Sequence, residues 1–357
     1  MRKIHINCAK PGMILARSIF ASDGNVLLGS WVELNQRYID RLKEKGVYHI
    51  YIEDELSQGI EVVDVIADET RIKAKGIVKS VMFDVAKDNE INDAYRITKI
   101  VNQIVDELLE NKDVLINLSD MRLIDDYTFG HCVNVCVLSV MTGIAMGYNQ
   151  LRLRELGVGA LLHDIGKMKI PIKLLKKPGQ LTDDEYKEIK RHTILGFDIL
   201  RNCDTISKIS ANTALAHHER CDGTGYPNGL LKDQIHDFSK IVAIADVYDA
   251  MTSDRAYRKA LEPYKAVEYI LAMSLTQFDY NVAKIFIGNI SIYPVGSGVV
   301  LNTGEKGLVV EVNKEFPTRP RVRIILDKYG CHYNKFEEID LLQHPTIFVT
   351  STCNDLM

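Results

Sequence analysis

Short runs of alternating apolar and polar residues, typical of strands, mark the first part of the chain. The runs are "GMILARSIF" and "HIYIE", and a glycine-containing turn, "SDGN", follows the first of them. The stretch "QRYIDRLKEKG" instead repeats its apolar positions with the period of a helix and ends on Gly46, a residue that favours a helix C-terminus. We therefore expect a small α/β unit over residues 1–65.

From Asp68 onward the apolar positions recur every three or four residues, which is typical of amphipathic helices. Two such stretches are separated by the polar bend "KDNEIND". Their apolar positions are Ile72, Ile77, Val81, Val85, Ile97, Ile100, Val101, Ile104, Val105 and Leu108. This pattern predicts a helical linker over residues 66–119.

The centre of the chain, residues 120–290, has few alternating runs and many helix signals. In "LTDDEYKEIKRH", Thr182 and Glu185 have the spacing of a capping box, so a helix is expected to begin there. From residue 291 to 357 the alternation returns in "GSGVVLNTGEKGLVVEVNKEF" and "RPRVRIILDKYG", which predicts a small β-barrel or sheet. The fold class is thus mainly α: a helical core with a small N-terminal α/β unit and a small C-terminal β unit.

Charge and composition exclude several classes of protein. Lysine and arginine number 44 against 48 aspartates and glutamates, so we expect neither a nucleic-acid polymer nor a membrane as a partner. The N-terminus lacks a signal-sequence pattern, and the longest nearly apolar run, "VCVLSVMTGIAM", is too short to span a bilayer, which predicts a cytoplasmic protein. The seven cysteines are scattered without a CxxC pair, which predicts free thiols.

Histidines and acids recur through the helical centre in a pattern that predicts a metal site. Imidazoles with carboxylates, without cysteines at matching intervals, form sites that hold Fe, Mn, Zn or Ni. These residues are too far apart for one helix, but a bundle of helices can aim them at one central point. The result is the outline of a dinuclear hydrolytic site. Its members, in chain order, are His131, His163, Asp164, His192, His217, His218 and Asp246.

The order of these motifs resembles the HD-GYP family of bacterial cyclic di-GMP phosphodiesterases, a branch of the HD metal-dependent phosphohydrolases. The resemblance rests on "HDIGK", "HHERCDGTGYP" and "IADVYDAMTSDRAYR" and covers about half of the chain. Within it, "HHExxDGxGYP" is a highly specific signature. The first sixty residues and "YPVGSGVVLNTGEKGLVVEVN" resemble, more weakly, terminal units that accompany some members. An HD-type helical bundle is therefore implied for the core.

The resemblance implies two divalent transition metals, usually iron or manganese. Asp164 would bridge the two ions and, with Lys167, would be a catalytic residue. Beside Asp164, the first ion would be enclosed by His131, His163 and Asp246, and the second by His192, His217 and His218.

The glycine-rich run "DGTGYP" requires a sharp turn of the backbone, at which Gly223 and Gly225 remove an obstructing Cβ. By resemblance, this turn presents Tyr226 to the ligand. Lys167 would reach a phosphate oxygen held by the metals. Two arginines of "SDRAYR" would grip the second phosphate of the cyclic dinucleotide, so that the implied substrate-binding residues are Lys167, Tyr226, Arg255 and Arg258.

Two positions depart from the family pattern. Some members carry a carboxylate, one helical turn before the first histidine, that recruits a third metal; Tyr127 stands there, so a dinuclear site is expected. Ala256 replaces the usual proline of the substrate loop. Cys132 and Cys221 lie beside ligands, where a redox-sensitive thiol is one interpretation and an inert buried thiol the commoner one.

The resemblance implies a phosphodiesterase that hydrolyses cyclic di-GMP to pGpG, and a further cleavage to GMP is left open. A hydroxide bridging two metals about 3.5 to 4 Å apart would attack phosphorus while the ions neutralise the developing charge. One alternative is a cyclic di-GMP-binding signalling scaffold with little turnover. Another is a phosphodiesterase for a different cyclic dinucleotide such as cyclic GMP-AMP, and a third is a general HD phosphohydrolase acting on nucleotides. A homodimer is left open by the sequence.

Overall fold

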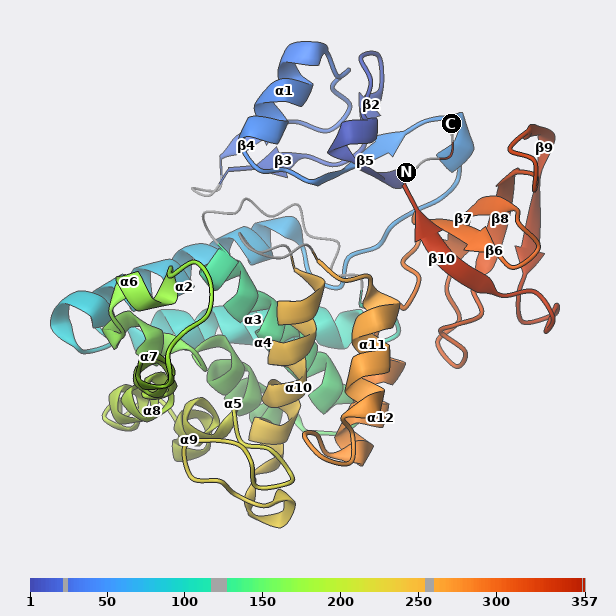
Figure 1. The fold of residues 1–357 in the computed structure, drawn as a ribbon. Coiled ribbons are helices and arrows are strands. Elements are labelled where there is room, and N and C mark those ends of the chain that lie inside the picture. The colour runs from blue at the N-terminus through green and yellow to red at the C-terminus, as the bar shows by residue number, and fades with distance from the viewer. Residues whose placement is uncertain (22–24, 117–126, 254–259, 355, 357) are drawn as a thin grey trace.

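The computed structural model shows a helical core with two small units beside it (Figure 1). The N-terminal unit lies beside the start of α2, and the C-terminal β unit lies next to the N-terminal unit, so that the chain termini are close together. The residues that the structure describes are 1–21, 25–116, 127–253, 260–354 and 356.

The N-terminal unit is the predicted α/β unit. Its sheet has the antiparallel order β1-β5-β2, and β3 and β4 form a separate hairpin whose predicted turn falls at residues 22–24, outside the described residues. The helix ends as predicted, because Gly46 has a φ of 74° and its N–H donates to the Lys43 carbonyl at 3.0 Å. The elements are β1 (Arg2–His5), η1 (Ile6–Cys8), β2 (Ile14–Leu15), β3 (Ile19–Phe20), β4 (Val26–Leu28), α1 (Gln36–Glu44), β5 (His49–Glu53) and η2 (Glu55–Ser57).

The helical core surrounds α4 (Tyr127–Ala145), which is buried on all sides from residue 130 to 143. A helix in this position must be apolar all round, which explains its composition. Its stretch Thr128–Ala145 is long and apolar enough to cross a membrane, but 78% of it is buried inside the structure, as in any core helix. The other helices are α2 (Asp68–Asp88), α3 (Ala94–Glu110), α5 (Gln150–Leu161), η4 (Ile165–Lys169), α6 (Ile172–Leu175), α7 (Asp183–Lys190), α8 (His192–Arg201), α9 (Lys208–Ala216), η5 (Lys232–Gln234), α10 (Asp237–Thr252), α11 (Pro263–Ala272) and α12 (Tyr280–Gly288).

The two helices expected as a linker, α2 and α3, pack into the same hydrophobic core as the central helices. Val81 and Ile104, for example, belong to one buried cluster with Val137 of α4. The bend between α2 and α3 lies at "KDNEIND", as predicted, and α7 begins with the predicted capping box of Thr182 and Glu185. The boundaries of the four domains stay a prediction.

The C-terminal unit is an antiparallel sheet with the strand order β10-β6-β7-β8-β9. It touches the N-terminal unit, because Lys3 N–H donates to the Gly296 carbonyl at 3.0 Å and Arg323 donates to the carbonyls of Leu56 and Gln58 at 3.2 and 2.7 Å. The predicted fold class is therefore confirmed. The strands are β6 (Gly298–Leu301), β7 (Lys306–Glu311), β8 (Arg321–Leu326), β9 (His332–Asp340) and β10 (Val349–Cys353).

Candidate metal centre

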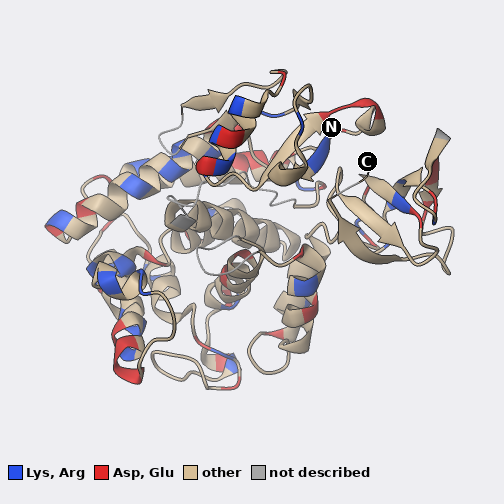
Figure 2. Ribbon diagram, turned by 45° about the horizontal axis from the view of Figure 1, so that its top comes forward, with Lys and Arg blue, Asp and Glu red and all other residues tan. Residues whose placement is uncertain are grey.

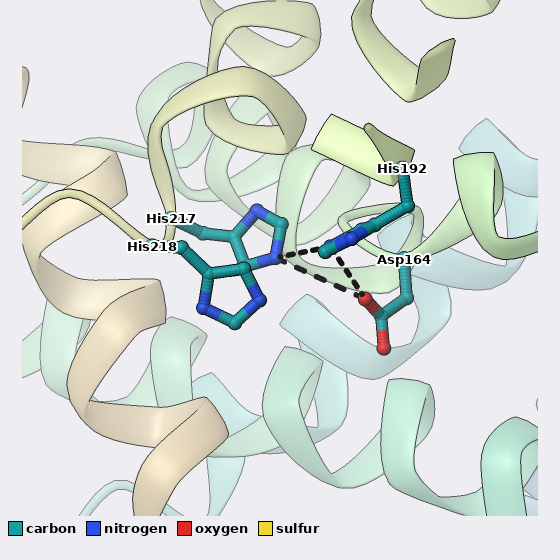
Figure 3. Close-up of side chains that lie close together, drawn as sticks. All are labelled: Asp164, His192, His217 and His218. Carbon is teal, nitrogen blue, oxygen red and sulfur yellow. Dashed lines mark hydrogen bonds and ion pairs between the residues drawn. The ribbon is translucent and has the colours of Figure 1, made fainter. Parts of the chain in front are cut away.

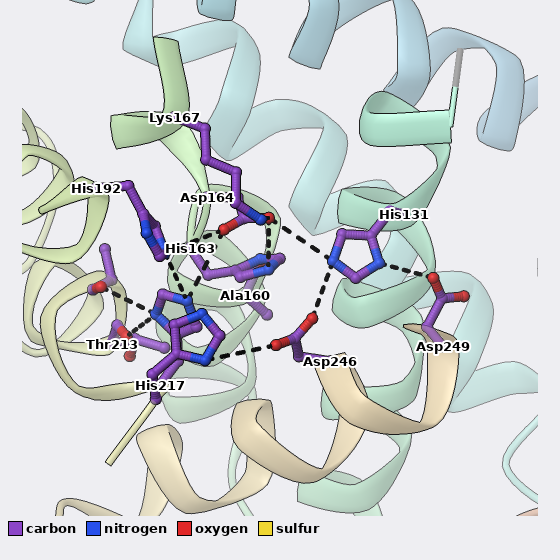
Figure 4. A network of polar contacts seen from close by, with 12 residues as sticks. His131, Ala160, His163, Asp164, Lys167, His192, Thr213, His217, Asp246 and Asp249 are labelled. Carbon is purple, nitrogen blue, oxygen red and sulfur yellow. Dashed lines mark hydrogen bonds and ion pairs between the residues drawn. The ribbon is translucent and has the colours of Figure 1, made fainter. Parts of the chain in front are cut away.

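The predicted histidines and acids converge in the interior of the helical core. His131 comes from α4, His163 and Asp164 follow α5, His192 begins α8, His217 and His218 follow α9, and Asp246 comes from α10. All of them except Asp246 form two compact groups, in each of which the ligand atoms all lie within 4.8 Å of one another. Asp164, which is 1% exposed, is common to both groups. One group is Asp164, His192, His217 and His218 (Figure 3), and the other is His131, His163 and Asp164 (Figure 4).

In the first group, two imidazole nitrogens face each other. His192 Nδ1 lies 2.7 Å from the Ile189 carbonyl, and His217 Nδ1 lies 2.9 Å from the Ala214 carbonyl. Because a carbonyl only accepts hydrogen bonds, both Nδ1 atoms carry the proton and both Nε2 atoms present a lone pair. These Nε2 atoms are 3.4 Å apart, and His192 Nε2 is 3.5 Å from Asp164 Oδ1. Lone pairs that converge in this way suit a cation between them.

The second group contains buried polar atoms without a hydrogen-bond partner. His163 Nδ1 donates to the Ala160 carbonyl at 2.8 Å, whereas His163 Nε2 and Asp164 Oδ1 are both buried and make no hydrogen bond. His131 Nε2 lies 3.8 Å from Asp164 Oδ2. Burying such atoms unpaired is costly, so the residues present fit metal ions well.

Burial sets the protonation of the imidazoles of the first group. It lowers the pKa of His192 to about 4 and that of His218 to about 3, and it holds the pKa of His217 well below its ordinary value. These imidazoles are therefore neutral at pH 7, which is the form that binds a metal.

The carboxylates of the site are ionised for a different reason. Burial alone would raise the pKa of Asp164, but the charge of Lys167, followed by the contact with His163, outweighs it and holds this pKa well below its usual range. Burial opposes ionisation of Asp246 in the same way, but its contact with His131 keeps the pKa of Asp246 well below its usual range. Neutral imidazoles beside ionised carboxylates are a donor set for divalent transition metals.

Asp246 and Lys167 lie at the edges of the two groups. Asp246 Oδ1 is 3.1 Å from His131 Nε2, and its Oδ2 is 3.9 Å from His218 Nδ1, so this carboxylate stands between the groups (Figure 4). Lys167, in η4, donates a short hydrogen bond to Asp164 Oδ2. The lysine thus reaches the shared carboxylate, as its position one turn after Asp164 allows.

The loop of the "GYP" run closes on the histidine pair. A Cβ on Gly225 would lie 2.3 Å from Arg220 N, so only glycine fits there, while Gly223 has a φ of 78°. The Tyr226 ring is 4.7 Å from the ring of His218, and the Tyr226–Pro227 peptide bond is cis. The sharp turn expected from this sequence is therefore present, and it places Tyr226 beside the first group.

Some expected site residues fall outside the described part of the chain. These are Arg255 and Arg258, together with Ala256; of Tyr127 only the backbone, at the start of α4, is described.

Reasoning from the sequence missed polar residues that support the site. Asp249 contacts His131, Asn134 contacts Asp249, and the buried carboxylate of Glu219 accepts hydrogen bonds from the loop N–H groups of Asn228 and Leu230 at 2.7 and 2.9 Å. Asp249 follows Asp246 by three residues on one helix, a spacing that places both on one face. That spacing was the available signal.

Comparison with known families agrees with this geometry. The model described as "HD domain" matches residues 103–282, which is half of the chain. The chain belongs to the HD domain family. A second model, described as a KOW domain associated with an HD domain, matches residues 298–355 and coincides with the C-terminal β unit.

Several relatives of this HD domain protein are named as cyclic dinucleotide phosphodiesterases. It is 37% identical over 252 residues to cyclic di-GMP phosphodiesterase PA4108 of Pseudomonas aeruginosa, covering 71% of this chain and 60% of that one. It is 33% identical over 224 residues to cyclic di-GMP phosphodiesterase PdeB of Borreliella burgdorferi, covering 63% and 59%. A 3′3′-cGAMP-specific phosphodiesterase 3 of Vibrio cholerae is 36% identical over 141 residues, covering 40% and 30%. The HD domain protein thus spans 60% or less of the length of these relatives. The HD domain match, together with the names of these relatives, confirms the resemblance to the HD-GYP family.

Proposed function

We propose that this chain is a metal-dependent phosphodiesterase that hydrolyses cyclic di-GMP to pGpG, with GMP as the product of a second cleavage. The observation that carries the proposal is the pair of buried ligand groups that share Asp164. Two groups with one common carboxylate are what a dinuclear hydrolytic site requires. The names of the relatives support cyclic di-GMP as the substrate.

We further propose which residues hold the ions, for which iron or manganese is the expected identity. When bound, two such ions would activate a water molecule and neutralise the charge that develops on the phosphate. In this assignment Asp164 contacts both ions. Of the other proposed ligands, His131, His163 and Asp246 hold one ion and His192, His217 and His218 hold the other.

The residues around the ligands have separate tasks in this proposal. Lys167 provides a positive charge at the scissile phosphate, and its hydrogen bond to Asp164 keeps the ammonium at the edge of the groups. Tyr226, beside His218, contacts the ligand from the loop. Arg255 and Arg258 bind the second phosphate.

Replacing either arginine with alanine should leave the metal content unchanged and raise KM, whereas Lys167→Ala should lower kcat.

The middle of α2 is basic, which favours an anionic ligand beside it. Residues 71–79 carry four lysines and arginines and no acidic residue, whereas the acidic residues of α2 lie before and after this stretch (Figure 2). One of these cations lies near the site, because a Cβ on Gly130, the neighbour of His131, would be 3.8 Å from Lys75 Cε. A local positive potential increases the rate at which anionic substrates are captured.

One experiment tests the proposal against its alternatives. The 357-residue protein, purified without chelator, would be analysed for metal content. It would then be incubated with cyclic di-GMP, 3′3′-cGAMP or cyclic di-AMP, and the products would be separated by chromatography. We expect about two transition-metal ions per chain and conversion of cyclic di-GMP to pGpG. A metal-free protein that converts none of the three would contradict the proposal, and tight binding of cyclic di-GMP without turnover would indicate the signalling scaffold.

The cyclic GMP-AMP alternative is kept because the Vibrio cholerae relative named for that substrate is about as similar over its matched segment as the cyclic di-GMP phosphodiesterases are. A ratio of kcat/KM that favours 3′3′-cGAMP over cyclic di-GMP would establish this alternative.

A further inference from the structure

His131 differs from its neighbours in what holds its ring. Nδ1 of His163, His192 and His217 faces a main-chain carbonyl, but Nδ1 of His131 lies 2.7 Å from Asp249 Oδ2 (Figure 4). Asp249 is fully buried on α10. A carboxylate behind a metal-binding imidazole fixes the ring orientation and makes the ligand nitrogen more basic.

Asp249 is itself held by an amide whose orientation is determined. Asn134 Nδ2 donates to Asp249 Oδ1 at 2.7 Å, and Asn134 Oδ1 accepts from Arg71 Nη1 at 2.9 Å. A guanidinium only donates and a carboxylate only accepts, so a flipped amide would lose both bonds. Asn134 is 1% exposed and Arg71 is 9% exposed, which places these bonds in a low-dielectric interior where they are strong.

The chain of contacts ends outside the region that the HD domain model matches. Arg71 is on α2, and its Nη2 lies 3.3 Å from Asp64 Oδ1. Asp64 Oδ2 is in turn 3.2 Å from Nη2 of Arg17, in the N-terminal unit. A polar connection therefore runs from the N-terminal unit through α2 to a ring at the metal centre.

We infer that Arg71, Asn134 and Asp249 are positioning residues for His131, and that α2 contributes in this way to metal binding. The inference rests on the proposed function, in which His131 is a metal ligand. Arg71 holds the amide of Asn134, Asn134 holds the carboxylate of Asp249, and Asp249 keeps the proton on Nδ1 so that Nε2 is directed at the ion. The N-terminal unit, through Arg17 and Asp64, steadies the far end of this connection.

The test measures metal affinity rather than turnover. Mn²⁺ would be titrated into the metal-free 357-residue chain, with calorimetry as the readout, for Asp249→Asn, Arg71→Gln and the parent protein. We expect Asp249→Asn to weaken Mn²⁺ binding about 10- to 100-fold, the usual range for a residue behind a metal ligand, and Arg71→Gln to weaken it by about tenfold or less. Lys73→Met is the matched control, because Lys73 is exposed on the same helix.

A double-mutant cycle separates positioning from general loss of structure. In a His131→Ala background, Arg71→Gln should have no further effect on Mn²⁺ affinity, because its contribution is transmitted through the missing ring. An equal loss in both backgrounds, or parent-like affinity in Asp249→Asn and Arg71→Gln, would overturn the inference. If Asp249→Asn does not fold, the Arg71→Gln cycle alone decides. Unchanged Mn²⁺ binding by His131→Ala itself would instead overturn the ligand assignment in the proposed function, and this inference with it.

Discussion

Asp164 is the side chain on which the largest number of site contacts depends. Its two oxygens face His131, His163, His192 and His217 as well as Lys167. Replacement of Asp164 with alanine removes the carboxylate that the two ligand groups share. Each of the histidines, by contrast, belongs to one group.

We therefore expect Asp164→Ala to lower the metal content to below one ion per chain. We also expect it to reduce turnover by more than about a hundredfold, a larger loss than the usual effect of replacing a residue that only supports a metal ligand. A single histidine variant such as His192→Ala should retain more metal. Elemental analysis and steady-state kinetics check both points. The control is Asp198→Ala, since Asp198 is partly exposed on α8 and pairs with Arg201. Near-normal metal content in Asp164→Ala would refute the shared role.

Gly166, within "HDIGK", allows η4 to approach the first turn of α8. A Cβ at this position would lie 2.0 Å from the His192 carbonyl oxygen and 2.5 Å from Gly196 N, which are main-chain atoms that cannot move aside easily. Overpacking that forces the backbone to shift costs about 1 to 3 kcal/mol, occasionally more. We expect Gly166→Ala to lower the free energy of unfolding of the metal-free protein by that amount, measured by urea denaturation.

The control for this change is Gly76→Ala on α2. A Cβ on Gly76 would meet nothing within 4 Å, and alanine is the better helix former, so this variant should be stabilised by about 0.5 to 1 kcal/mol. Equal destabilisation by the two variants would show that close packing at Gly166 is not the cause.

At the scale of elements, the loop over residues 222–231 depends on Glu219. Each of its carboxylate oxygens accepts a hydrogen bond from a main-chain N–H group, one from Asn228 and the other from Leu230. Glu219→Gln keeps one acceptor and turns a donor toward the other N–H, so about 1 to 3 kcal/mol of local stabilisation should be lost. Hydrogen exchange should show reduced protection of both amides while the metal content is unchanged. Asp233→Asn, at an exposed position nearby, should leave this protection intact.

The strand pair of the N-terminal unit contains a pH-sensitive histidine. Burial, together with the charges of Lys3 and His5, lowers the pKa of His49 to about 3. Between pH 6.5 and about pH 3, the unfolded chain therefore protonates His49 whereas the folded chain does not. Protonation favours the unfolded state in this range, so the folded protein keeps its full stability above pH 6.5 and loses stability as the pH falls from 6.5 towards 3.

We expect His49→Gln to make the free energy of unfolding less dependent on pH between 6.5 and 4, by up to about 1.4 kcal/mol per pH unit. Chemical denaturation at several pH values measures this dependence. Replacement of His332, which is exposed, serves as the control. An unchanged slope in His49→Gln would show that other groups cause the acid sensitivity.

Much of the site could be predicted because its residues occur in short local motifs. The pairs His163-Asp164 and His217-His218 are adjacent in sequence, and helix signals around them indicated a bundle that could bring them together. Arg71 could not be found in this way. It precedes Asn134 by 63 residues, and only the packing of α2 on α4 makes the two side chains neighbours.

The helices expected as a linker show the same limit for the fold. Their apolar positions predicted amphipathic helices correctly, but an amphipathic stripe does not tell which surface will cover it. In the folded chain Val81 and Ile104 are buried in the main core. Contacts between distant segments therefore had to come from the structure.

The whole molecule is held together by contacts among its three parts. A small hydrophobic cluster joins Ile60, which follows the N-terminal unit, to Leu308 and Ile325 of the C-terminal sheet. The guanidinium of Arg323 extends this contact to main-chain carbonyls. The two terminal units thus support each other, and the N-terminal unit also reaches α2 through Arg17.

Because α4 is buried, the alkylation rates of two of its thiols measure how often the helical core opens. Cys132 and Cys136 are fully buried, and burial raises the pKa of Cys136 to about 12 and that of Cys132 well above its ordinary value, so neither reacts as a thiolate in the closed protein. Cys331, in contrast, is exposed. An alkylating reagent should modify Cys331 at once and the two core thiols only as fast as the helix core opens.

Because Cys132 adjoins His131, added Mn²⁺ should slow the alkylation of Cys132 in proportion to occupancy of the metal centre. Mass spectrometry of the labelled peptides would then measure metal binding without any substrate. Equal rates for Cys132 and Cys331 would contradict the buried position of α4.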